Sequence, residues 1–188
     1  LPLGLLVAAG RMCKIAPIRW LVKFYISIAR GTPLMLQLLV VFYGPYYLFG
    51  ATLTTSYRFQ AVIIGFALNY AAYFAEIYRS GIQAIPKGQY EAAKVLGFNR
   101  SQTFFKIILP QVVKIITPSL GSECMTLVKD TSLAHVIGVM EIYVVATNQM
   151  ARSRGMIYLV VAGIFYLIMN AIVSKVFSVI EKRMNYYR

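Results

Sequence analysis

Acidic residues, histidine and cysteine are scarce in this sequence, and each shortage excludes a class of function. Six Asp and Glu stand against 19 Lys and Arg in 188 residues. The single histidine, His135, has no ligand-like neighbours, and the cysteines Cys13 and Cys124 lie far apart, so neither a metal centre nor a disulfide framework is expected. The sequence also lacks a Gly-x4-Gly-Lys-Ser/Thr phosphate loop, so ATP chemistry would have to come from another chain.

Apolar residues are abundant instead. The hydrophobic content of 59% and the mean hydropathy of +0.67 exceed what a soluble domain of this size contains. The net charge of +13 would suit a nucleic-acid binder only if the basic residues gathered on a soluble face. They lie between and beside apolar runs, which indicates a membrane protein and no nucleic-acid partner.

Five of the apolar runs are expected to cross the bilayer as helices. A crossing needs about 20 residues, so residues 1–10 are interpreted as the tail of a span whose beginning is absent. A signal peptide would need a basic region and a cleavage pattern, and neither is present. The remaining spans are expected at residues 34–49 (with a bend near Gly44–Pro45), 59–78, about 109–128 and 156–180. The predicted fold class is all-α, a polytopic membrane protein with one domain, residues 1–188.

Two connections have patterns of their own. Residues 11–30 are basic and are expected to form a loop and an amphipathic approach to the membrane. Residues 129–155 are expected to connect the last two spans, with a short half-apolar helix from about residue 133 to 146 packed over the bundle.

The basic residues predict the orientation. If the chain changes side at each crossing, fifteen of the nineteen Lys and Arg fall on the side that carries residues 79–114. Because basic residues concentrate on the cytoplasmic side, this segment is expected in the cytoplasm, with the start of the chain external and its end cytoplasmic.

The segment from about residue 80 to 110 has the pattern of a helix, a turn and a second helix. Gly97 can adopt the left-handed conformation that ends a helix, and Asn99 followed by Gln102 has the spacing of a capping box. In the first helix, Ala92 and Ala93 leave little side chain on one surface, and the neighbouring Glu91 offers a carboxylate to a basic partner. The pattern predicts a helix that docks on another protein.

The spacing of these residues resembles the coupling loop of permease subunits in ATP-binding-cassette (ABC) importers. The residues that carry the resemblance are Glu91, Ala92, Ala93, Gly97, Leu109 and Pro110. Three further blocks resemble the branch that imports polar amino acids: Arg30-Gly31-Thr32-Pro33, residues 75–82, and Lys129-Asp130-Thr131-Ser132-Leu133. The alternative is an ordinary amphipathic loop that happens to contain an alanine pair.

The resemblance implies a type I ABC importer permease in a bacterial cytoplasmic (inner) membrane. Two permease subunits, identical or homologous, would enclose the translocation path, and each would present its coupling helix to one of two ATPase subunits. An extracellular or periplasmic substrate-binding protein would deliver the amino acid. ATP and Mg would bind to the ATPase, with no cofactor and no catalysis on this chain, and ATP binding would swing the spans from inward-open to outward-open.

Ionisable residues inside spans are costly to bury and are functional candidates. Glu123 is expected near mid-membrane, and Ser119 and Thr126 share its helix face. A second stripe holds Asn69, Tyr73 and Glu76, with Tyr70 beside it. If both stripes face one cavity, a carboxylate and aromatic rings would suit a guanidinium or ammonium group, which predicts a basic amino acid: arginine or lysine first, histidine next.

Several alternatives remain open. Glu123 could pair with Lys114, with Lys129 or with a basic residue of the partner subunit, and a neutral polar substrate such as glutamine would need only the amide and hydroxyl groups. Glu76, three residues before Arg79, is interpreted first as an ion pair or a brace to the coupling loop, and Lys129 and Asp130 as gate or structural residues. An ion-coupled transporter or channel would predict inverted repeats, which the sequence does not show. A membrane enzyme would need a clustered nucleophile, base and metal-ligand set, which is also lacking.

Overall fold

The computed structural model describes residues 1–184, and this part of the chain is built of helices without a strand. In chain order they are α1 (Pro2–Met12), α2 (Ala16–Gly31), α3 (Leu34–Phe49), α4 (Thr55–Gln83), α5 (Lys87–Val95), α6 (Arg100–Gln102), the π-helix η1 (Thr103–Ile108), α7 (Leu109–Asp130), the 3-10 helix η2 (Thr131–Ile137), α8 (Ile142–Ser153) and α9 (Ile157–Arg183).

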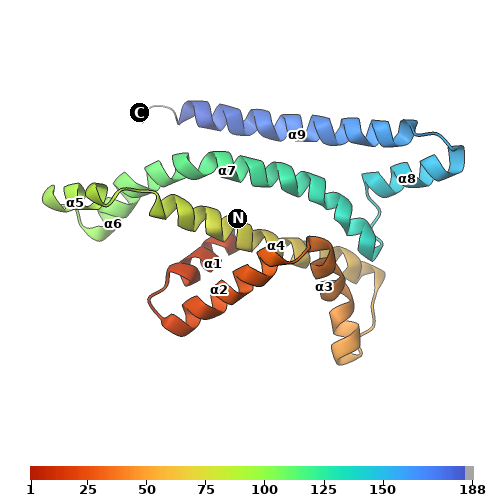
Figure 1. The fold of residues 1–188 in the computed structure, drawn as a ribbon, viewed down its shortest axis with the longest axis horizontal. Helices are drawn as coiled ribbons and strands as arrows, with labels where there is room; N and C mark the ends of the chain where they lie inside the picture. Colours follow the sequence, from red (N-terminus) through yellow and green to blue (C-terminus); the bar gives the residue numbers. More distant parts are fainter. Residues whose placement is uncertain (185–188) are drawn as a thin grey trace.

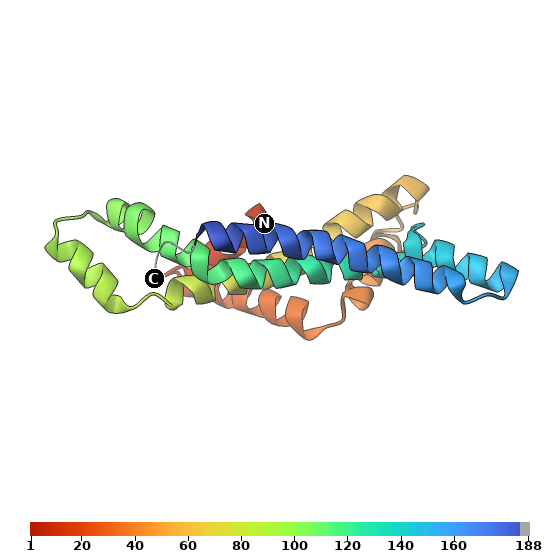
Figure 2. The same ribbon diagram turned by 90° about the horizontal axis from the view of Figure 1, so that it is seen from above.

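Three long helices, α4, α7 and α9, give the molecule its elongated shape (Figures 1 and 2). Helix α7 packs between α4 and α9, and α1, α2 and α3 all contact α4. The short helices α5 and α6 lie at one end of this layer and α8 at the other (Figure 1). Helix α4 is therefore the centre of the bundle.

Small residues on α4 allow its neighbours to approach closely, as is usual between helices in membranes. A Cβ atom added to Gly65 would lie 2.7 Å from Leu38 of α3, and one added to Gly81 would collide with Ile116 of α7. Ala61, Ala72 and Ala75 are fully buried.

Helix length and composition support the predicted membrane fold. Three segments are long and apolar enough to cross a bilayer: Thr55–Gln83, the continuous helical stretch Arg100–Ile137, and Ile157–Arg183. They contain the predicted spans at residues 59–78 and 109–128 and all but the first residue of the predicted span 156–180. Helices α2 and α3 together make a fourth, broken candidate, while α1 is a shorter apolar helix. The predicted total of five crossings stays a prediction.

A sharp bend of 111° lies at Thr32–Pro33 between α2 and α3, a position that the sequence did not predict. Pro45 lies inside α3 without ending it, and the bend expected near Gly44–Pro45 stays a prediction. Residues 11–30, expected to form a loop and an amphipathic approach, contain a short non-helical turn at residues 13–15 followed by the helix α2. Pro33 explains the break, because its ring disfavours helical conformation in the preceding residue and Thr32 is extended.

The prediction of one helix over residues 133–146 is wrong, because the structure has two separate helical elements there, η2 and α8. Gly138 has a left-handed φ of +77° and ends η2. The Glu141 carboxylate then accepts hydrogen bonds of 2.8 Å from the backbone N–H groups of Tyr143 and Val144, which begins α8.

Candidate functional site

The predicted docking segment is a helix, a turn and a second helix. Gly97 has a φ of +78°, and the backbone N–H of Phe98 reaches back 3.0 Å to the Ala93 carbonyl to close the end of α5. The capping box is complete: Asn99 Oδ1 accepts from the Gln102 N–H at 2.8 Å, and Gln102 Oε1 accepts from the Asn99 N–H at 3.0 Å. The predicted helix–turn–helix, the left-handed Gly97 and the capping box are all confirmed.

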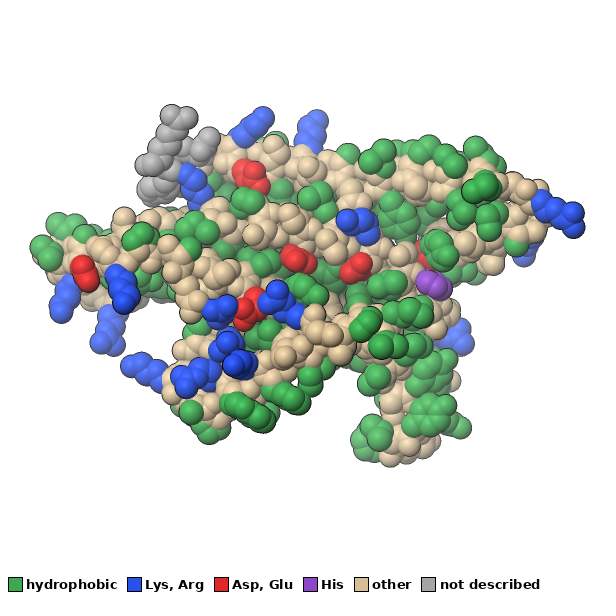
Figure 3. Space-filling model, in the orientation of Figure 1, with side chains coloured by type: hydrophobic (Ala, Val, Ile, Leu, Met, Phe, Trp, Pro, Cys, Tyr) green, Lys and Arg blue, Asp and Glu red, His purple; other side chains and the backbone are tan. Residues whose placement is uncertain are grey.

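The outward face of α5 differs from the predicted one. Glu91 and Ala92 are exposed, but Ala93 is buried with 1% exposure, in a helix that packs on η1. The apolar side chains that reach solvent are Val95, 87% exposed, and Leu96, 72% exposed, which the sequence reasoning missed. The sequence pattern that could have predicted their exposure is a pair of apolar residues directly before the glycine of a polar loop. Hydrophobic side chains gather at this end of the molecule beside Lys and Arg (Figure 3).

Leu109 and Pro110 lie at the start of α7, partly buried. Pro110 has no N–H to donate to the Lys106 carbonyl, and its ring would clash there in a regular helix. The preceding turns widen into a π-helix in which the Leu109 N–H bonds to Phe104, five residues back. The proline thus shapes the entry of the chain into α7.

Glu76 joins three helices through arginines. Arg79 Nη2 lies 2.6 Å from Glu76 Oε2, and Arg79 Nε lies 3.1 Å from both carboxylate oxygens. Arg11 of α1 and Arg30 of α2 lie farther from it, at 3.8 and 3.9 Å. The predicted ion pair with Arg79 is present, and Glu76 has the contacts of a brace.

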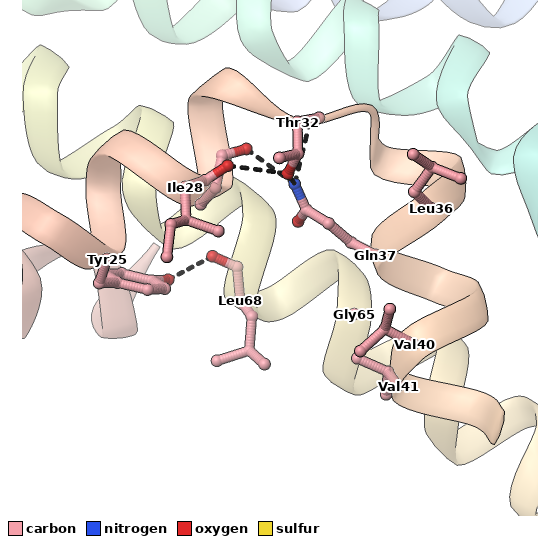
Figure 4. A pocket seen from close by; sticks show the side chains of 10 residues that line it. Tyr25, Ile28, Thr32, Leu36, Gln37, Val40, Val41, Gly65 and Leu68 are labelled. Atoms are coloured by element: carbon pink, nitrogen blue, oxygen red, sulfur yellow. Dashed lines mark hydrogen bonds between the residues drawn. The ribbon is translucent and has the colours of Figure 1, made fainter. Parts of the chain in front are cut away.

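The side chain of Asn69 forms hydrogen bonds at the bend between α2 and α3. Its Nδ2 donates to the Ala29 carbonyl and to Gln37 Oε1, both at 3.0 Å, and the residue is 4% exposed. Gln37 Nε2 in turn donates to Ala29 at 2.9 Å and to the carbonyl and hydroxyl oxygens of Thr32 at 3.1 and 2.8 Å (Figure 4). Carbonyls freed by a helix break inside a membrane need such donors. Sequence reasoning missed Gln37, whose signal was the single amide in an apolar run.

An apolar groove lies between the two arms of this bend and α4, with Tyr25, Val40 and Leu68 among its lining residues (Figure 4). Tyr25 donates its hydroxyl to the Leu68 carbonyl there. The groove holds about 340 Å³ but carries no charged side chain, so it is not a site for a charged ligand.

The stripe of Ser119, Glu123 and Thr126 lies on the surface of α7. Ser119 and Thr126 are exposed and Glu123 is partly exposed. Among the ion pairs of the described part of the chain, none joins Glu123 to Lys129 or to an arginine. Its electrostatic neighbours are Arg30 and Asp130.

Tyrosines of α4 lie between the two stripes. The buried Tyr70 donates its hydroxyl to Asp130 Oδ2 at 2.8 Å, and its ring lies 6.2 Å from the ring of Tyr73. The Arg30 guanidinium lies 5.3 Å from the centre of the Tyr73 ring. Figure 3 shows acidic and basic side chains beside each other in the middle of this face. Tyr70, Tyr73 and Glu123 thus lie in one region, called here the charged region, together with Arg30 and Asp130. Asn69 lies apart from it, at the bend.

Among residues 1–184, no group of three or more His, Cys, Asp and Glu side chains is placed to hold a metal ion. The side chains of the region provide a carboxylate, a guanidinium, hydroxyl groups and aromatic rings.

Comparisons with known proteins bear on the family of the chain. Residues 1–186 match the family described as "binding-protein-dependent transport system inner membrane component". The L-cystine transport system permease protein TcyB of Bacillus subtilis (strain 168) is 40% identical over 98% of this chain and 78% of its own length. The arginine transport system permease protein ArtQ of the same organism is 34% identical over 97% and 82%. A crystal structure of an amino acid ABC transporter with histidines contains a chain that is 34% identical, with a TM-score of 0.85 over 97% of this chain and 84% of that one.

Proposed function

This chain belongs to the family of binding-protein-dependent transport system inner membrane components, and we propose that the amino acids it carries are basic, arginine or lysine first and histidine next. The membership makes the chain the membrane permease subunit of an amino-acid ABC importer. Such a subunit is not catalytic, and a partner ATPase hydrolyses ATP. A second permease subunit and a binding protein complete an importer of this kind.

The surroundings of Glu123 are the observation that supports a basic substrate. Its carboxylate is partly exposed on α7, has no ion pair with Lys129 or an arginine among the described residues, and lies in the same charged region as the Tyr73 ring. A carboxylate in a membrane helix is costly without a positive partner. A guanidinium or ammonium would supply that charge and could rest against an aromatic face, and Ser119, Thr126 and Tyr70 would add hydroxyl groups. The arginine relative and the structure with histidines support this substrate class.

A neutral amino acid is the second candidate. It is favoured by the 40% identity with a cystine permease, which exceeds the 34% identity with the arginine permease. In that case Glu123 would pair with a basic residue of the second permease subunit.

The exposed surface of α5 and its turn supports an assignment as the ATPase-coupling element. Glu91, Ala92, Val95 and Leu96 form a protruding polar and apolar tip. One such tip on each of two permease subunits would dock on each of two ATPases, which would bind ATP and Mg. Closing of the ATPases would then draw the tips together and turn the spans outward. In this arrangement α5 is cytoplasmic, the start of the chain external and the end cytoplasmic.

The test is ATPase activity of the reconstituted permease, ATPase and binding protein across a panel of amino acids. We expect stimulation by arginine, lysine or histidine that Glu123→Gln abolishes. Glu181→Gln, at an exposed acid near the end of α9, is the matched control and should leave stimulation unchanged. Stimulation by glutamine or cystine alone, indifferent to the Glu123 substitution, would refute the basic substrate and support the neutral one.

A further inference from the structure

The guanidinium of Arg30 lies in the charged region, where its ion pair with Glu76 is a long one. Its distance of 3.9 Å from Glu76 is too long for a hydrogen bond. Both oxygens of that carboxylate already accept from Arg79, at 2.6 to 3.1 Å. No hydrogen bond from Arg30 is formed to any other residue of the described part of the chain, and its side chain is 45% exposed. The N–H groups of Arg30 are therefore available to a ligand.

The position of Arg30 is nevertheless well defined. It lies in the last turn of α2, directly before the break at Thr32–Pro33 that Gln37 and Asn69 stabilise. The ring of Tyr73 lies 5.3 Å from its guanidinium carbon and holds it by a cation–π contact. A planar guanidinium supported from one face keeps its edge donors free, and these fit a carboxylate in a two-point contact.

Arg30 and Glu123 then present opposite charges that interact without an ion pair. Every free amino acid carries an α-carboxylate and at least one positive group. We propose that Arg30 binds the α-carboxylate of the transported amino acid, while Glu123 takes a positive group of the same molecule. This inference rests on the proposed function, but it concerns a group that basic and neutral amino acids share.

The test compares an amino acid with its α-carboxamide, which removes only the negative charge. L-Arginine and L-argininamide are the pair for a basic substrate, and L-glutamine and its α-amide for a neutral one. Equilibrium binding is measured on the permease–ATPase complex in nanodiscs without the binding protein, because that protein has a site of its own.

We expect the native complex to bind the carboxylate form about tenfold to a hundredfold more tightly than the amide, the effect of one charge-assisted hydrogen-bonded pair. In Arg30→Gln the ratio should fall to about one, with the amide little affected, and Arg30→Lys should retain part of it. Arg19→Gln, at an exposed arginine of the same helix, is the control and should keep the native ratio. Partial misfolding lowers the binding of both ligands equally, so it leaves the ratio unchanged.

An unchanged ratio in Arg30→Gln would overturn the assignment, as would tighter arginine binding in that variant, which would make Arg30 a competitor of the substrate. If glutamine and its amide show the effect and arginine does not bind, the α-carboxylate site stands and the basic-substrate proposal fails. If no amino acid binds to the native complex, both proposals fail.

Discussion

The hydroxyl of Tyr70 donates a hydrogen bond of 2.8 Å to Asp130 Oδ2 and so connects the middle of α4 to the last residue of α7. Tyr70 is 4% exposed, and Asp130 directly precedes the 3-10 helix η2. The bond lies beside Glu123 and Tyr73 and fixes one wall of the charged region.

Tyr70→Phe should weaken the connection between α4 and α7 beside the charged region. The substitution leaves the partly exposed Asp130 carboxylate without this donor, and loss of one such hydrogen bond costs about 1 kcal/mol. We expect a lower melting temperature in detergent and reduced transport. Tyr47→Phe, at a residue that is 78% exposed, should change neither. Equal melting temperatures for both variants would show that the bond does not stabilise the bundle.

Gly97→Ala should separate ATP hydrolysis from transport. A left-handed residue with a side chain costs about 1–2 kcal/mol, so the turn after α5 would change its path and displace the exposed tip. We expect assembled complexes that hydrolyse ATP with little amino-acid uptake, and Glu91→Gln should act in the same direction.

The matched control for this turn is Gly88→Ala. Gly88 lies inside α5 with no atom within 4 Å of an added Cβ, so an alanine there should be neutral or slightly stabilising. Normal uptake by Gly97→Ala would refute the coupling role of the turn.

Gly81→Ala should push α4 and α7 apart, because the added Cβ collides with Ile116. Overpacking of this kind costs about 1–3 kcal/mol. We expect a lower melting temperature that the second substitution Ile116→Ala partly restores by making room. Gly163→Ala on α9 meets no atom within 4 Å and should be neutral. A double variant less stable than Gly81→Ala would contradict this account.

Gln37→Leu should damage the bend at Thr32–Pro33. It removes the donors to Ala29 and Thr32, and we expect a loss of about 1–3 kcal/mol in stability, seen as faster proteolysis between α2 and α3. Gln83→Leu is the control, because that exposed glutamine only accepts from Arg79 at the end of α4. Native-like resistance of Gln37→Leu would mean that Pro33 alone maintains the bend.

The sequence by itself determined the membrane class, the long helices and the turn after α5. Apolar runs, a capping box and a glycine before Asn99 act over a few residues, so their consequences do not depend on the rest of the fold. The family resemblance, carried by Glu91, Gly97 and Pro110, was confirmed for the same reason. The helix over residues 133–146 failed because the break at Gly138 and the cap at Glu141 outweighed an apolar pattern.

Only the tertiary structure decided which polar side chains belong together. The stripe of Asn69, Tyr73 and Glu76 was correct as a helix face, but the bend, the Arg30 guanidinium and Arg79 divide its members among three environments. Ala93 likewise turned inward against η1. Periodicity fixes the direction of a side chain on its own helix, whereas its partner depends on how helices from distant parts of the chain pack around α4.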